Sequence, residues 1–206
     1  MDTIYKSDTK RVFLTFDDGP SPVTSKILDI LKQENVKATF FILGSNVDSR
    51  KDVVKRMYEE GHYLANHGYS HTYSKIYSSP QSVLDEYNEC NDKVKNAIEV
   101  PDYNSHLFRF PGGLAGGKYA EIKKEAKEIL LQNNIVNVDW NALTGDAETN
   151  NLSVEFEMTR LTETMESKNS LVILMHDTNA KKTTSQSLQE IIDYLKSLGY
   201  EFRTLK

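Results

Sequence analysis

Short apolar stretches alternate with amphipathic stretches along almost the whole chain. The apolar stretches are rich in Val, Ile, Leu and Phe, which is typical of buried strands. We expect strands at residues 12–16, 37–42, 63–67, 107–110, 135–139, 171–175 and 200–204. Between them, apolar positions recur every three or four residues, as at Ile27, Ile30 and Leu31. This periodicity predicts six amphipathic helices.

Individual residues mark where some of these helices begin and end. Ser79 followed by Pro80 is typical of a helix N-cap with proline at the first helical position. Gly61 and Gly199 stand where a left-handed residue would end a helix. Cys90 lies on the apolar face of one predicted helix, so we interpret it as a core residue.

Seven strands alternating with six helices predict an α/β fold with a parallel sheet, either closed as a barrel or open and doubly wound. Neither a linker nor an internal repeat interrupts the alternation, so residues 1–206 form one predicted domain. In both architectures, ligands bind where the carboxyl ends of the strands meet the following loops. Polar residues just past the strand ends are therefore the candidates for function.

Composition and charge argue against several classes of protein for this chain. A chain of 206 residues that is 38% apolar can build one sizeable core, which excludes a disordered or collagen-like chain. The net charge is −5 and the basic residues form no patch, which argues against a nucleic-acid partner. The longest apolar run, residues 171–175, is far too short to span a membrane, so we expect no transmembrane segment. A single cysteine excludes an intrachain disulfide, and a metal site would have to use histidines and carboxylates.

Two predicted strand ends carry a set of metal-ligand residues. The first strand runs into Asp17 and Asp18, and the third runs into His67, with His71 four residues further on. Two imidazoles four residues apart can face the same point. Two histidines and one aspartate leave a coordination position open for water, which is the pattern of catalytic zinc, and the same set also suits ferrous iron.

Three further strand ends carry ionisable groups. The fourth strand ends with Arg109, the fifth with Asp139 followed by Trp140, and the sixth with His176. Each could be structural by itself, but together they suit one mechanism at one edge of the sheet. The other two histidines, His62 and His106, precede strands and are expected at the opposite edge.

These residues resemble the motifs of the polysaccharide deacetylases, carbohydrate esterase family four, also known as the NodB homology domain. The matching segments are Thr15–Pro20, His67–His71, Arg109–Gly113, Asp139–Trp140 and Leu174–Asp177, and they occur in the family's order. The resemblance covers nearly the whole chain. It implies a distorted, TIM-barrel-like parallel (β/α) barrel with fewer than eight regular strands, in agreement with the seven expected here.

The resemblance also implies a role for each site residue. Asp18, His67 and His71 would bind one divalent metal, most commonly Zn²⁺, with Co²⁺ or another divalent ion as alternatives. Asp17 would be the general base, and Arg109 would orient it. Asp139 would pair with His176, the general acid.

The resemblance further assigns residues that would contact the substrate. Trp140 and Leu174 would shape the pocket for the acetyl methyl group, and the Gly112 N–H would donate to the oxyanion. Many family members carry Tyr where Gly112 stands, so this chain lacks one substrate-facing side chain.

The implied reaction is release of acetate from N-acetylglucosamine residues of a polysaccharide, with peptidoglycan as the first choice. Chitin oligomers, cell-surface poly-N-acetylglucosamine and acetylxylan are alternative substrates. Two other hypotheses are a hydrolase of another small amide, imide or ester on the same barrel and a sugar-binding domain that has lost catalysis.

Localisation depends on how the chain begins. Family members usually act outside the cytoplasmic membrane, but the first residues lack the basic start, the apolar stretch and the cleavage site of a signal peptide. We therefore expect an extracellular or cell-surface enzyme whose export or anchor segment is absent from this sequence, or a cytoplasmic one if the sequence is complete.

Overall fold

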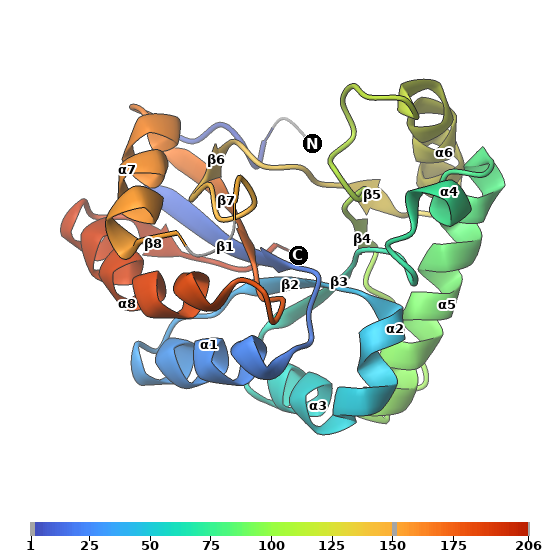
Figure 1. Cartoon of the computed structure of the whole chain (residues 1–206), viewed down its shortest axis with the longest axis horizontal. Coiled ribbons are helices and arrows are strands. Elements are labelled where there is room, and N and C mark those ends of the chain that lie inside the picture. The colour runs from blue at the N-terminus through green and yellow to red at the C-terminus, as the bar shows by residue number, and fades with distance from the viewer. Residues whose placement is uncertain (1–2, 150–151, 206) are drawn as a thin grey trace.

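The computed structural model of the chain describes residues 3–149 and 152–205, so the first two residues, on which the N-terminal expectation partly rests, lie outside the described residues. Within the described residues, eight strands join one sheet and every pair of strands is parallel. Seven of them follow the order β5-β4-β3-β2-β1-β7-β6 and curl into a half-barrel, and β8 pairs with β1 (Figure 1). The strands are β1 (Arg11–Asp17), β2 (Thr39–Ile42), β3 (Tyr63–Asn66), β4 (Leu107–Phe108), β5 (Val136–Asn137), β6 (Ala142–Leu143), β7 (Ser170–His176) and β8 (Glu201–Phe202).

Helices follow most of the strands and lie around the outside of the half-barrel (Figure 1). They are α1 (Pro22–Gln33), α2 (Gly44–Val47), η1 (Asp48–Arg50), α3 (Lys51–Glu59), α4 (Tyr73–Ile76), α5 (Pro80–Ile98), α6 (Ala120–Gln132), α7 (Val154–Met165) and α8 (Lys182–Ser197). No helix in the described residues is long and apolar enough to span a membrane.

Strand β1 shows how the sheet separates core from site. Its even-numbered residues, such as Leu14 and Phe16, are fully buried in the main hydrophobic cluster with residues of α1, α7 and α8. Successive side chains of a strand point to opposite faces, so the odd-numbered residues Thr15 and Asp17 point into the half-barrel. The alternation along the strand therefore places the carboxylate of Asp17, the last residue of β1, on the inner face.

The parallel register brings the strand ends to one level. Asp17 lies opposite His176 in the β1–β7 pair and opposite Phe41 in the β1–β2 pair. Asn66 at the end of β3 lies opposite Phe108, directly before Arg109. Residues that follow the strands therefore converge on one edge, as expected for a parallel sheet.

The predicted architecture is confirmed, including several helix ends. The Ser79 Oγ accepts a hydrogen bond from the Ser82 N–H at 3.1 Å, and Pro80 is the first residue of α5. Gly61 and Gly199 both have φ of +81°, the left-handed geometry expected after a helix. Cys90 is fully buried, as predicted.

The prediction of elements was wrong in three places. Strand β6 was not expected, because two residues show no alternation and this strand is defined by its pairing with β7. Strands β4, β5 and β8 are each two residues long, shorter than the four or five residues expected. The short helices α2, η1 and α4 add to the six expected, because one helical turn is too short to show a period of 3.6 residues.

Candidate active site

A buried ion pair joins β1 to the end of β4. The Arg109 Nη1 lies 2.7 Å from the Asp17 Oδ1 and also donates to the Thr15 Oγ1 at 2.8 Å. The Arg109 Nε donates to the Val138 carbonyl oxygen at 2.9 Å, and the Nη2 donates to the Asp139 carbonyl oxygen at 3.1 Å. Arg109 is 0% exposed and Asp17 is 2% exposed, so these contacts fix the carboxylate in one orientation.

Burial gives the Asp17 carboxylate the character of a base. Desolvation raises the pKa of Asp17 above its usual value, and the positive charge of Arg109 opposes this rise. A carboxylate with a raised pKa binds a proton more tightly than an exposed one. The structure therefore provides a more basic group that is held in place by a cation.

Three potential metal ligands converge beside this pair. Asp18 follows β1, and His67 and His71 lie in the turn after β3. The Asp18 Oδ1 lies 3.4 Å from the Nε2 atom of each histidine. One ligand atom from each of the three residues lies within 4.8 Å of the others.

The environment of these residues fits a divalent metal. The Asp18 Oδ1 is buried and has no hydrogen-bond partner within residues 3–149 and 152–205. The His67 Nδ1 lies 2.7 Å from the Arg109 carbonyl oxygen, to which it can donate, leaving the Nε2 lone pair directed at the cluster. Burial lowers the pKa of His67 to about 3, which keeps the ring neutral, as metal ligation requires.

The backbone is strained at two of these three residues. Asp18 has φ of +74° and His71 has φ of +53°, in the left-handed region that non-glycine residues seldom adopt. Such strain persists where surrounding contacts impose it, and it clusters at functional sites. Here the Asp18 N–H donates to the Phe41 carbonyl oxygen at 3.2 Å, and the Asn46 Nδ2 donates to the Asp18 carbonyl oxygen at 2.9 Å.

The loop that carries the two histidines is held by Glu86 of α5. One carboxylate oxygen of Glu86 accepts hydrogen bonds from the Tyr69 N–H at 2.9 Å and from the Ser70 N–H at 2.8 Å. Its other oxygen accepts from the Ser70 hydroxyl at 2.5 Å. Glu86 was not singled out from the sequence, because a glutamate on an amphipathic helix resembles any solvated residue.

The expected pairing of His176 with Asp139 is wrong, because the partner of His176 is Asp146. The His176 Nδ1 lies 2.8 Å from the Asp146 Oδ1, and the His176 N–H donates to the Asp146 Oδ2 at 2.6 Å. Strand β6 explains the difference, since Leu143 lies opposite Leu174 and the chain beyond both strands runs side by side. Asp139 instead follows β5, at the opposite end of the strand order from β6.

The Asp146 pair controls the charge of His176. Burial lowers the pKa of His176, but the hydrogen bond and charge of Asp146, with the charges of Asp17 and Asp18, outweigh that effect and raise it to about 9. His176 is therefore a protonated imidazolium at neutral pH. The site thus holds a carboxylate and an imidazole, both of raised pKa, at the ends of neighbouring strands.

The remaining predicted residues lie around this centre. The Trp140 ring lies 5.7 Å from the Arg109 guanidinium carbon, and Leu174 is buried in β7 opposite Thr15. The Asp139 Oδ2 accepts from the Leu114 N–H at 3.1 Å. Gly112 lies in the loop after β4 with φ of +76°.

The two histidines expected at the opposite edge do not join the site. The His62 Nδ1 accepts a hydrogen bond from the Ala38 N–H at 3.1 Å, and burial lowers the pKa of His62 to about 4. His106 is exposed, and its Nδ1 lies 3.1 Å from the Asn134 carbonyl oxygen.

A parallel half-barrel that carries three potential metal ligands, a buried carboxylate of raised pKa and a histidine of raised pKa at its strand ends has the residues that metal-dependent hydrolases use. Residues 5–130 match the family described as polysaccharide deacetylase. The chain is 36% identical over 204 residues to a putative polysaccharide deacetylase, YheN, of Bacillus subtilis, covering 96% of this chain and 67% of that protein. The chain therefore belongs to the polysaccharide deacetylases, carbohydrate esterase family four.

Two further relatives are informative. The peptidoglycan-N-acetylglucosamine deacetylase PgdA of Listeria monocytogenes is 36% identical over 197 residues, which are 95% of this chain but only 38% of PgdA. The structure of a Streptococcus mutans CE4 esterase superposes with a TM-score of 0.90 at 35% identity, covering 100% of this chain and 90% of that one. The chain thus corresponds to a little over a third of PgdA and to almost all of the S. mutans structure.

Proposed function

We propose that this polysaccharide deacetylase removes N-acetyl groups from N-acetylglucosamine residues of peptidoglycan, with zinc as its metal, at the cell surface. The supporting observation is that the buried Asp17–Arg109 pair and the Asp146–His176 pair flank the Asp18, His67 and His71 cluster. Relatives such as PgdA of L. monocytogenes, named for this reaction, support the choice of substrate.

Both ends of an amide need help for hydrolysis, since water is a poor nucleophile and an amine is a poor leaving group. Asp18, His67 and His71 would hold the metal, which when bound supplies polarisation of the acetyl carbonyl and a water of lowered pKa. Asp17 accepts the proton of the attacking water, and Arg109 keeps the carboxylate oriented toward it.

Departure of the amine is the task of His176. The imidazolium donates its proton to the sugar nitrogen as the carbon–nitrogen bond breaks, which leaves acetate and a free amino group. Asp146 holds the ring through its Nδ1, so the Nε2–H is the atom free to donate. The pKa of about 9 keeps this acid charged at neutral pH.

Recognition of the acetyl group falls to residues on the inner wall of the half-barrel. Trp140 and Leu174 would enclose the methyl group, and the Gly112 N–H would donate to the oxyanion that develops on the carbonyl oxygen. A pocket bounded by these two side chains would admit a small acyl group, so larger amides should react poorly.

The proposal is tested by acetate release. Metal-stripped protein with and without added zinc or cobalt is incubated with purified peptidoglycan, N-acetylglucosamine oligomers and acetylxylan. We expect metal-dependent acetate release, fastest from peptidoglycan. Faster acetate release from acetylxylan or chitin oligomers would make that polymer the substrate in place of peptidoglycan. Metal binding without acetate release from any polymer would refute the proposal.

A further inference from the structure

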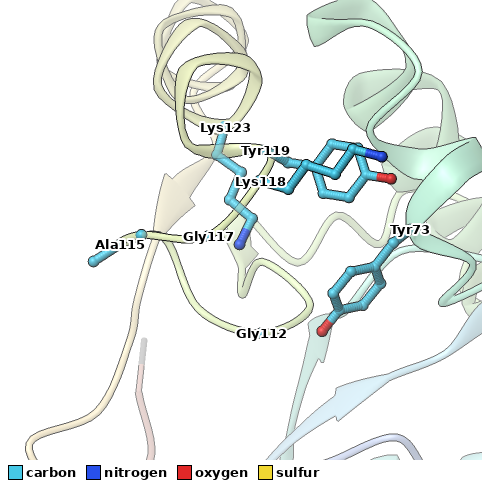
Figure 2. A pocket seen from close by; sticks show the side chains of 8 residues that line it. Tyr73, Gly112, Ala115, Gly117, Lys118, Tyr119 and Lys123 are labelled. Atoms are coloured by element: carbon cyan, nitrogen blue, oxygen red, sulfur yellow. The ribbon is translucent and has the colours of Figure 1, made fainter.

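A second pocket lies next to the catalytic centre, between the loop after β4 and helix α4. Its volume is about 310 Å³, and Tyr73, Gly112, Tyr119 and Lys123 are among the residues that line it (Figure 2). The Tyr73 ring centroid lies 5.6 Å from that of His71 and 6.3 Å from that of Tyr119. One aromatic ring therefore separates the pocket from the metal-ligand cluster.

Gly112 makes room for Tyr73. A Cβ atom on Gly112 would lie 2.6 Å from the Tyr73 hydroxyl oxygen, so a side chain at this position would force the tyrosine to move. Tyr73 is 39% exposed, and Figure 2 shows its hydroxyl directed toward Gly112. The tyrosine thus presents an amphipathic surface of the kind on which the apolar face of a sugar ring packs.

The charge of the pocket is opposite in sign to that of the chain. The chain carries −5, whereas the charged side chains among the described residues that line the pocket are Lys118 and Lys123. The Lys118 ammonium lies 5.3 Å from the centroid of the Tyr119 ring. A pocket with two lysines and without an acidic lining residue in the described segments favours an anionic ligand.

Lys123 is a buried cation whose ammonium group has hydrogen-bond donors left for a ligand. It is 4% exposed, and its Nζ donates to the Gly113 carbonyl oxygen at 2.6 Å. An ammonium group has three donors, and within the described residues it makes this one hydrogen bond; the Nζ also lies 5.1 Å from the centroid of the Tyr77 ring. Figure 2 shows the Lys123 nitrogen directed toward the loop of Gly112 and Gly117. Burial lowers the pKa of Lys123, the negative charge of Asp139 opposes this, and a bound carboxylate would offset the effect of burial further.

We propose that this pocket binds the sugar next to the one being deacetylated and selects a neighbour that carries a carboxylate. The inference rests on the proposed function and deepens it, because a muramic-acid-type sugar in peptidoglycan carries such a group and a chitin-type sugar does not. The carboxylate comes either from a free lactyl ether or from the peptide attached to it. Tyr73 and Tyr119 would contact the ring, and Lys118 and Lys123 would contact the acid.

The test compares kcat/KM for acetate release from three glycans of equal length. One is a neutral N-acetylglucosamine oligomer, one contains muramic acid with free lactyl carboxylates, and one carries the stem peptides. We expect the zinc-loaded enzyme to prefer an acidic glycan about tenfold. Lys118→Gln should reduce this preference about threefold, and Lys123→Met should abolish most of it.

Lys124→Gln is the matched control, since Lys124 is an exposed lysine on α6 that does not line the pocket. It removes the same charge one residue from Lys123 and should leave the preference unchanged. Lys118 is exposed, so Lys118→Gln keeps the test valid even if Lys123→Met does not fold.

The outcomes separate the two proposals. A preference for the free lactyl glycan, or only for the peptide-bearing glycan, supports the pocket and identifies the source of the carboxylate. Equal kcat/KM on neutral and acidic glycans, unchanged by Lys118→Gln, overturns the pocket while the deacetylase function stands. Acetate release from none of the three glycans overturns the proposed function and the inference that depends on it.

Discussion

Two carboxylates at the strand ends are each held by a cation, yet they prepare opposite chemistry. The Asp17 Oδ1 lies 2.7 Å from Arg109, and the Asp146 Oδ1 lies 2.8 Å from the His176 Nδ1. A guanidinium does not titrate in the working range, so in the first pair the carboxylate is the group that exchanges protons. An imidazole does titrate, so in the second pair the carboxylate sets the pKa of its partner.

The comparison shows that similar geometry gives a base or an acid according to which member of the pair can release a proton. Burial raises the pKa of Asp17. Burial lowers the pKa of His176, but the hydrogen bond and charge of Asp146, with the charges of Asp17 and Asp18, raise it to about 9. Enzymes that need both roles at one pH commonly separate them by environment in this way. The predictions below alter one pair at a time or test the residues around a pair.

The largest effect is expected from Asp17→Asn. An amide cannot accept the proton of the attacking water, so the rate of acetate release should fall about 10²- to 10⁴-fold. The measurement is kcat on the preferred glycan, with zinc content determined in the same sample. A variant that binds zinc normally and keeps a near-wild-type rate would show that Asp17 is not the base.

Arg109→Met, which removes the cation of the Asp17–Arg109 pair, should lower the stability of the fold. It leaves the Asp17 carboxylate buried without its cation, which typically costs about 3–5 kcal/mol in the free energy of unfolding. The measurement is urea denaturation of both single variants and of the Asp17→Asn, Arg109→Met double variant. If the ion pair causes the loss, the double variant should lose less than the sum of the singles. Strictly additive losses would refute this.

Asp146→Asn should move the pH profile. Without the carboxylate, the pKa of His176 should fall from about 9 toward the ordinary value of 6.5. The alkaline limit of kcat should shift to lower pH, and the rate at pH 7.5 should fall about tenfold because fewer molecules carry the proton. The pH dependence of kcat measures the shift, and NMR titration of His176 locates it.

Asp139→Asn is the control for this change. Asp139 also stands at the mouth of the half-barrel, but its Oδ2 accepts from the Leu114 N–H rather than from His176. The alkaline limit should therefore stay in place. If Asp139→Asn moved the limit and Asp146→Asn did not, the pairing described here would be wrong.

The Asp146–His176 pair should also make the free energy of unfolding of the wild-type protein depend on pH. The folded-state pKa of His176 is raised, so its contribution is complete below about pH 6.5 and is lost as the pH rises through about 9. Asp146→Asn should flatten this part of the dependence. The free energy of unfolding, measured by urea denaturation across this pH range, provides the check.

The smallest effect is expected behind the second pair, at Glu157 of α7. Burial raises the pKa of Glu157 from 4.5 to about 7, and its Oε2 accepts from the Ser187 hydroxyl at 2.5 Å. The folded state therefore loses stability as the pH rises from about 4.5 to 7, because a charge must form in a buried place. Glu157→Gln removes that cost, so it should raise Tm by a few degrees at pH 8 and have little effect at pH 4.5. A lower Tm at pH 8 would contradict this.

Much of this protein was readable from its amino-acid sequence. The alternation of apolar strands with amphipathic helices predicted the parallel α/β fold, because these periodicities reflect burial that each element achieves locally. The position of Asp17, Asp18, His67, Arg109 and His176 at or just past the ends of strands also predicted that they meet, since parallel strands end at one edge.

Only the tertiary structure decided the partners within that edge. Asp139 and Asp146 are both acidic residues near the fifth predicted strand, and sequence alone offered no reason to prefer Asp146 for His176. The choice follows from β6, a two-residue strand whose pairing with β7 is a contact between distant segments. The close approach of Tyr73 to Gly112 likewise joins helix α4 to the loop after β4, two segments that are far apart in sequence. Local pattern determines which elements form, whereas such pairings depend on how the whole chain packs.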